Sequence, residues 1–202
     1  MDVFEAINTR TSARNLVEPG PTDAQWAILL HAACRAPDHG RLRPWNFLII
    51  RGEARRRLGE VMAQALRLGN PQLPPEALDR ERSKPLRAPA ILAVAATPKP
   101  HPTIPEVEQI VACGAAAQNI LLAAHALGLG AMWRTGSCAY DAHVCGALGL
   151  RPGARIVGFL YLGTAEPSTG GKIAADPVRA VEWHEVPRDF VVPAEQSRHA
   201  PT

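Results

Sequence analysis

Lysine and aromatic residues are scarce in this sequence. Only Lys84, Lys99 and Lys172 among its 22 basic residues are lysines, and 5% of all residues are aromatic. The basic residues exceed the 19 acidic ones by a net charge of +3 and form no block. Nucleic-acid binding usually needs a concentrated basic stripe, so we expect no nucleic acid among the partners.

Cysteine is also scarce, and its spacing fits neither a disulfide framework nor a metal site. Cys34, Cys113, Cys138 and Cys145 form no C-x-x-C pair, and no two histidines have the H-x-x-x-H spacing. We therefore expect no bound metal. The opening MDVFEAINTR lacks the basic and apolar regions of a secretion signal, so we expect reduced thiols in a cytoplasmic protein.

No apolar run is long and unbroken enough to predict a membrane span. The most apolar stretch, residues 107–130, contains charged and amide side chains, which indicates a buried helix and no membrane among the partners. With 202 residues, 47% of them hydrophobic, the chain can form the core of one domain. We expect a single domain over residues 1–202, with an irregular C-terminal arm over about residues 165–202.

Capping signals and periodicity predict alternating helices and strands. Asp2 caps a short helix, a capping box at Thr22 and Gln25 opens the next, and Pro105 begins the longest. Further helices are expected over residues 53–68, 76–84 and 140–148, and strands over residues 45–50, 89–97, 129–135 and 156–163. The strand 45–50 has few charges and is expected to be central. This alternation indicates a layered α/β or α+β sheet.

Arginine-bearing segments at the ends of predicted elements give the strongest indication of a ligand. They are residues 10–14 (RTSAR), 35–39 (RAPDH) and 133–135 (WRT). A guanidinium fork, a hydroxyl and free backbone N–H groups together suit a phosphate monoester. Each segment alone is better explained as solvated surface, so only their combination predicts an anion site.

Through these segments the sequence resembles the nitroreductase family of FMN enzymes, and most closely its short YdjA-type subgroup of NAD(P)H nitroreductases. The family's R-x-S is Arg10-Thr11-Ser12, and the subgroup's R-A-P-D-H with P-W-x-F runs from Arg35 to Phe47. The pattern G-x-G-x-x-W-R-[ST]-G covers residues 128–136, and I-V-G-F-L-Y-L-G-T covers residues 156–164. The blocks occur in order over about residues 2–165.

The resemblance implies an α+β fold with a nitroreductase-like mixed central β-sheet flanked by helices. It implies a domain-entwined homodimer with two FMN sites at the interface. The implied activity is that of an oxidoreductase in which NAD(P)H gives a hydride to FMN. By a ping-pong mechanism the hydride then passes to a nitroaromatic, quinone or similar small-molecule acceptor. The flavin N5 carries this chemistry, so no side chain is expected to be catalytic.

The resemblance also implies how one chain would hold the FMN phosphate and one flavin edge. Arg10 and Ser12 would grip the phosphate, and Thr11 would add backbone contacts. Arg14 would approach the flavin N1–C2=O edge, where a cation favours the anionic hydroquinone. The late basic phosphate ligand of the family has no clear counterpart here, Lys172 being the candidate.

Other residues are implied at the flavin ring and at the nicotinamide nucleotide. Arg35 and His39 would reach the FMN of the neighbouring subunit. The isoalloxazine would be lined by Trp133, Arg134 and Thr135. NAD(P)H is associated with Ala123, Ala124, His125, Ala126, Leu127 and Gly128.

Departures from the family pattern occur mainly in the second block. Asp38 replaces the common serine, and Arg41 and Arg43 stand where Asn and Gln are more frequent. These arginines would recruit an acidic substrate or the 2′-phosphate of NADPH, or else are solvated loop residues.

Other activities remain open at this point. One alternative is an FMN-binding or sensing module of the same fold without turnover. A less favoured one is a Cys–His hydrolase in which Cys138 or Cys145 pairs with His143.

Overall fold

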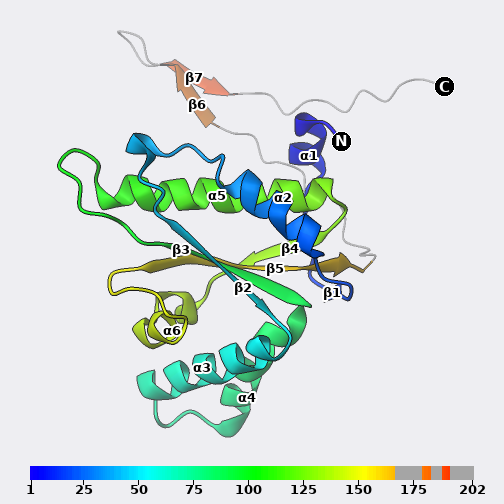
Figure 1. Cartoon of the computed structure of the whole chain (residues 1–202), viewed down its shortest axis with the longest axis vertical. Helices are drawn as coiled ribbons and strands as arrows, with labels where there is room; N and C mark the ends of the chain where they lie inside the picture. The colour runs from blue at the N-terminus through cyan, green and yellow to red at the C-terminus, as the bar shows by residue number, and fades with distance from the viewer. Residues whose placement is uncertain (167–178, 183–187, 192–202) are drawn as a thin grey trace. The chain divides into compact units, whose positions relative to one another are not determined.

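Figure 1 shows a computed structural model of the chain, which describes residues 1–166, 179–182 and 188–191. Contacts divide the chain into two units, Met1–Ser168 and Thr169–Thr202. In the second unit, β6 (Arg179–Glu182) and β7 (Arg188–Val191) pair as a two-stranded antiparallel sheet. The expected C-terminal arm is thus described only in part, and Lys172 lies outside the described residues.

A five-stranded sheet forms the centre of the first unit. Its strands are β1 (Leu16–Val17), β2 (Trp45–Arg51), β3 (Ala90–Ala96), β4 (Gly130–Arg134) and β5 (Arg155–Ala165). The long strand β5 pairs with β3 along one edge and with β4 and β1 along the other, all antiparallel. This arrangement brings β4 beside the segment that precedes β1.

The strand β2 is at the edge of this sheet, not at its centre as expected for residues 45–50. Among the described strands it pairs only with β3. Its side chains are apolar because helices cover both faces. Phe47 packs against the core on the α5 side, and Leu48 and Ile50 pack against the core on the α3 side. Within β2 only Ile50 is buried, and Trp45, Phe47 and Leu48 are half-buried, so apolar composition predicted a strand but not its position in the sheet.

Helices cover both faces of the sheet (Figure 1). One face carries α2 (Asp23–Ala33) and α5 (Glu106–Ala126), and the other carries α3 (Glu53–Gly69), α4 (Pro75–Ser83) and α6 (Ala142–Ala147). Side chains of neighbouring residues in β5 alternate between the two cores, Leu160 facing α5 and Phe159 and Tyr161 facing α3. The expected α+β fold is confirmed, but the described strands of this sheet pair only antiparallel, in place of the mixed sheet that was expected.

The sequence signals at the helix starts are confirmed in detail. Thr22 Oγ1 accepts a hydrogen bond from the Gln25 N–H at 3.2 Å, and Gln25 Oε1 accepts one from the Thr22 N–H at 2.9 Å. Asp2 caps α1 (Val3–Thr9) through the Glu5 N–H, and Pro105 stands at the N-cap of α5. These three helices therefore begin where their local chemistry predicts.

The helix α5 forms much of the core of the first unit. Among the described residues, it is the one helix that is long and apolar enough, by length and composition, to cross a membrane. However, Cys113, Ala116, Ile120 and Ala124 are fully buried in the core that α5 forms with α2 and the sheet. The small side chains allow α2 to pack closely against α5, as the predicted buried helix requires.

Candidate functional site

The loop Arg10–Arg14 lies at the C-terminal end of α5 and beside β4. Arg10 caps α1, and Thr9 Oγ1 lies 2.8 Å from Nε2 of His125, near the end of α5. The Ala13 N–H donates a hydrogen bond to the carbonyl of Ala131 in β4 at 3.0 Å. Thr11, Ser12 and Arg14 are exposed. The loop is thus fixed at both ends while its polar groups stay free for a ligand.

A cavity of about 340 Å³ opens at the end of β4. Trp133, Arg134 and Thr135 line it, as do residues of α3, α4, β5 and the short helical turns η2 (Lys84–Arg87) and η3 (Ser137–Tyr140). Its described lining holds the cations Lys84, Arg87 and Arg134 but a single carboxylate, Glu81. The cavity therefore has an excess of positive charge and suits an anionic ligand.

The side chain of Trp133 is fixed by its neighbours on β5. Its Nε1 donates a hydrogen bond to the Val157 carbonyl at 3.3 Å. A Cβ at position 158 would lie 2.1 Å from that nitrogen, so only glycine leaves room for the indole. Gly158 is thus required by a close approach and not by its backbone conformation.

Arg134 points to the other face of the sheet, where its guanidinium carbon lies 5.6 Å from the ring centroid of Tyr161. Burial raises the pKa of Tyr161 to about 12, although the charge of Arg134 opposes this shift. The phenol therefore stays neutral at physiological pH. Arg134 keeps a full positive charge at the cavity wall.

Glu81 is a buried carboxylate with a partner on each oxygen. Its side chain is 8% exposed, Oε2 lies 2.5 Å from Lys84 Nζ, and Oε1 accepts a hydrogen bond from Cys138 Sγ at 3.2 Å. Burial, and then the hydrogen bond to Glu81, raise the pKa of Cys138 to about 12. Cys138 is therefore a protonated donor near neutral pH.

This geometry gives no support to a Cys–His hydrolase. A nucleophilic cysteine needs a lowered pKa, but burial raises the pKa of both Cys138 and Cys145. His143 Nε2 lies 3.3 Å from Gln64 Oε1, a partner that does not activate a thiol.

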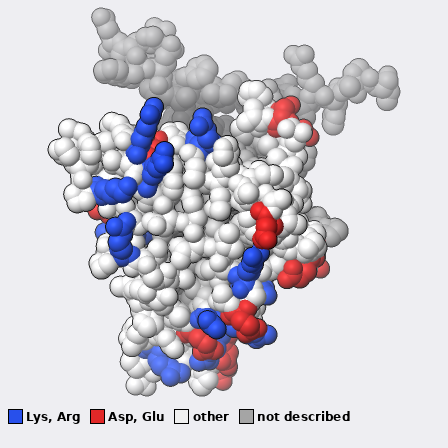
Figure 2. Space-filling view, in the orientation of Figure 1, with Lys and Arg blue, Asp and Glu red and all other residues white. Residues whose placement is uncertain are grey.

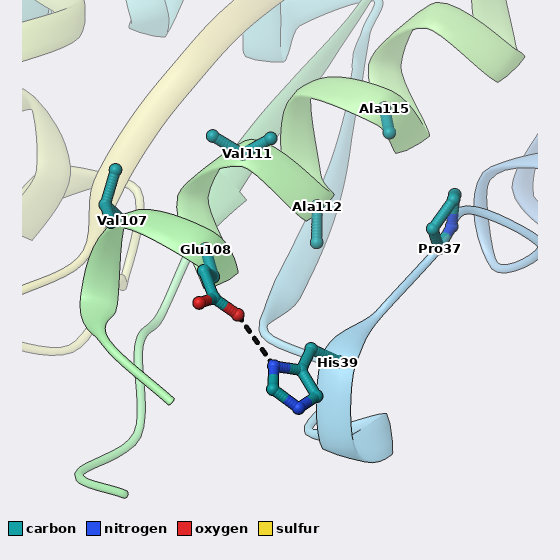
Figure 3. A pocket seen from close by; sticks show the side chains of 7 residues that line it. All are labelled: Pro37, His39, Val107, Glu108, Val111, Ala112 and Ala115. Atoms are coloured by element: carbon teal, nitrogen blue, oxygen red, sulfur yellow. Dashed lines mark hydrogen bonds and ion pairs between the residues drawn. The ribbon is translucent and has the colours of Figure 1, made fainter. Parts of the chain in front are cut away.

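Of the other predicted residues, His39 lies at the N-terminal end of α5. His39 Nδ1 is 2.7 Å from Glu108 Oε2, beside a second cavity of about 370 Å³ (Figure 3). Pro37, Val107 and Val111 contribute to its mostly apolar wall. Arg35 is exposed in the segment that follows α2.

Basic side chains gather near this end of α5, whereas over α3 and α4 they alternate with acidic ones (Figure 2). Arg41 and Arg43 are both exposed and both have a positive φ, of 53° and 48°. Asp38 Oδ2 accepts a hydrogen bond from the Arg43 N–H at 2.6 Å, which helps to hold this left-handed conformation. The aspartate that departs from the family pattern thus shapes the loop.

The two groups of predicted residues are far apart in one chain. Positions 108 and 125 of α5 are separated by about 25 Å along the helix axis, at ~1.5 Å per residue. The fold brings Arg10–Arg14 beside β4. It does not bring His39 there.

The segment 123–128 ends α5 and turns toward β4. Ala124 is fully buried, whereas Ala126 and Gly128 are exposed. Gly128 has a φ of +74°, the left-handed conformation that ends many helices. A nucleotide has access only to the exposed part of this segment.

Sequence reasoning did not identify Glu81, Lys84, Arg87 or Tyr161. Glu81, Lys84 and Arg87 lie on one charged stretch that predicts only a surface helix. Tyr161 lies within a predicted strand whose residues are expected to be buried in the core. Their common position at one cavity arises only when α4 and η2 pack beside β4 and β5.

Known proteins are similar to this chain in both sequence and fold. The nitroreductase family profile matches residues 7–164. "Putative NAD(P)H nitroreductase YdjA" of Escherichia coli strain K12 is 40% identical over 185 residues, covering 91% of this chain and 100% of that protein.

Solved structures give the same result. The nitroreductase-like family protein from Bacillus cereus has a TM-score of 0.72 at 27% identity, covering 87% of this chain and 92% of that one. "A putative nitroreductase in complex with fmn" from Desulfovibrio desulfuricans has a TM-score of 0.64 at 27% identity, covering 86% of this chain and 92% of that one.

Proposed function

Because the chain belongs to the nitroreductase family, we propose that it is an FMN-dependent oxidoreductase that uses NAD(P)H. It transfers a hydride by a ping-pong mechanism to a nitroaromatic, a quinone or a similar acceptor. One observation carries the proposal: the predicted residues Trp133, Arg134 and Thr135 line a cation-rich cavity. The chain binds one cofactor there and uses no side-chain nucleophile.

The residues at this cavity fit FMN. The phosphate is anionic, and the isoalloxazine gains negative charge on two-electron reduction. Arg10 and Ser12 bind the phosphate, since their loop is tied to β4 through the bond between Ala13 and Ala131. Lys84 and Arg134 supply fixed positive charge at the ring, which stabilises the reduced cofactor.

We further propose that the functional unit is a homodimer with shared sites. FMN is shorter than the distance of about 25 Å that separates the two groups of residues along α5. His39 can therefore contact this FMN only from a partner chain, and we assign Arg35 to the same partner because the family resemblance implies it. Val111 of α5 and Phe4 of α1 are 64% and 74% exposed, which supports an apolar surface that a second copy covers.

The chain contributes binding, orientation and exclusion of water. FMN, when bound, supplies the hydride acceptor and donor at N5. Phe159 and Tyr161 form a buried, uncharged floor under the cavity, and Gly158 holds Trp133 in one position. The nicotinamide nucleotide contacts the exposed part of residues 123–128. Arg41 and Arg43 favour NADPH if they reach its 2′-phosphate, and are otherwise solvated.

Steady-state kinetics with purified FMN-loaded protein test this proposal. We expect oxidation of NAD(P)H that depends on a nitroaromatic or quinone, with parallel double-reciprocal plots as the donor is varied at several acceptor concentrations. Intersecting plots would contradict the ping-pong mechanism alone. A yellow, FMN-loaded dimer without turnover on any acceptor would instead indicate a binding or sensing module.

A further inference from the structure

Glu81 is the one carboxylate in the described lining of the cation-rich cavity. It is buried, and its two oxygens contact Lys84 Nζ at 2.5 Å and Cys138 Sγ at 3.2 Å. Neither the sequence motifs nor the proposed phosphate contacts use it. A buried, paired carboxylate beside a ligand cavity affects the charge of that cavity more strongly than any exposed acid does.

The contacts of Glu81 reach two separate parts of the cavity wall. Lys84 begins η2, whereas Cys138 belongs to η3, directly after β4. Lys84 is 44% exposed, so its flexible side chain has room to leave the wall. The ion pair draws the ammonium toward Glu81, whose negative charge offsets it. The protonated thiol of Cys138 keeps the carboxylate itself in place.

We propose that Glu81 is a positioning residue that pairs with the Lys84 ammonium at the cavity wall, offsets its charge and thereby lowers the reduction potential of the flavin bound there. The inference rests on the proposed function. Two-electron reduction with uptake of one proton adds one negative charge to the isoalloxazine. A nearby carboxylate disfavours that added charge, and a nearby ammonium favours it. Glu81 and Lys84 therefore have opposite effects on the potential.

The opposite signs separate this role from a purely structural one. If Glu81 only joined α4 to η3, loss of either partner of the ion pair would loosen the cavity in the same way. Glu81→Gln removes the charge but keeps the shape and an acceptor for Cys138. Lys84→Gln removes the positive charge from the same pair. Only an electrostatic role predicts shifts of opposite direction.

The test is a dye-equilibrated reductive titration of the FMN-loaded full-length protein. We expect Glu81→Gln to favour the reduced cofactor about tenfold, a rise of about 30 mV for a two-electron couple, and Lys84→Gln to lower the potential by a similar amount. Glu60→Gln is the matched control. Glu60 lies on α3, pairs with Arg82 at 3.0 Å and is 57% exposed, so its loss should leave the potential unchanged.

Equal potentials for Glu81→Gln and Glu60→Gln would overturn the inference, and so would shifts of Glu81→Gln and Lys84→Gln in the same direction. If Glu81→Gln does not fold, Lys84→Gln alone decides. An unchanged potential in that variant would show that the ion pair does not affect the bound flavin, and would overturn the inference. A wild-type protein that binds no FMN would refute the proposed function instead. The two failures are thus distinguishable.

Discussion

The two ends of α5 differ in chemistry, although both carry residues predicted to contact the same cofactor. At the C-terminal end, the arginine-bearing loop Arg10–Arg14 lies beside β4, and the following residues of β4 line a cavity with an excess of positive charge. At the N-terminal end, the His39–Glu108 pair borders a mostly apolar hollow. We propose that one end holds an anion and that the other offers an apolar surface to a partner. In that proposal one chain carries two complementary halves of a site.

The largest effect is expected from Arg10→Ala at the charged end. Hydrogen bonds to charged groups contribute about 1.5–3 kcal/mol, so FMN should bind about 10–100-fold more weakly. Fluorescence titration of the apoprotein with FMN measures this change. Arg56→Ala is the control, because Arg56 lies on α3 in an exposed pair with Glu53. Equal affinities of the two variants would remove Arg10 from the site.

The second-largest effect is expected from a glycine substitution in β5, beside Trp133. Gly158→Ala places a Cβ 2.1 Å from Trp133 Nε1, and relief of such overpacking costs about 1–3 kcal/mol of unfolding free energy. Urea unfolding measures the loss. The matched control is Gly146→Ala in α6, where an added Cβ meets nothing within 4 Å. A stability as high as that of Gly146→Ala would show that Trp133 is not held as described.

Mixing two defective chains tests whether the two ends of α5 serve different cofactors. Arg10→Ala and His39→Ala each damage both sites of a homodimer. After co-refolding in equal amounts, about one quarter of all sites should be intact, because half of a two-fold mixed dimer's sites combine two undamaged halves. FMN-dependent turnover that recovers on mixing is the expected result. No recovery, with mixed dimers present, would mean that both residues act within one chain.

The smallest effect on turnover is expected from the cysteines. A Cys138→Ser, Cys145→Ala double variant should keep the NAD(P)H oxidation rate within about twofold, since neither thiol is activated. The same variant has a signature in alkaline stability. The folded-state pKa of Cys138 is raised from 9.0 to about 12, so the unfolded chain loses this proton first. Wild-type unfolding free energy should fall between pH 9 and 12, and the variant's should fall less steeply. Identical slopes would contradict the buried-thiol assignment.

Local chemistry explains how much of the fold was predictable. Asp2, Thr22 and Pro105 act on backbone groups within one turn, so their effect is readable in sequence. The position of β2 in the sheet depends on which strands pair with it. Its apolar residues are typical of a strand covered by helices on both faces. Such a strand can lie at the edge or at the centre of a sheet. The strand β1 is only Leu16–Val17, too short to show a period.

The candidate site was predictable only where its residues form contiguous blocks. Trp133, Arg134 and Thr135 lie together and line the cavity as the resemblance implies. Glu81 and Lys84 are about fifty positions away and carry no motif, so only tertiary packing reveals them. That the loop 10–14 and His39 lie at opposite ends of α5 is likewise a property of the fold.

The central claim is that this chain binds FMN and that NAD(P)H reduces it there. The most direct test is an anaerobic absorbance spectrum of the purified protein, reconstituted with FMN and then mixed with NADH or NADPH. The account predicts a protein-bound flavin band near ~450 nm that survives gel filtration and is bleached by one of the nucleotides. A colourless protein that retains no FMN after incubation would contradict it.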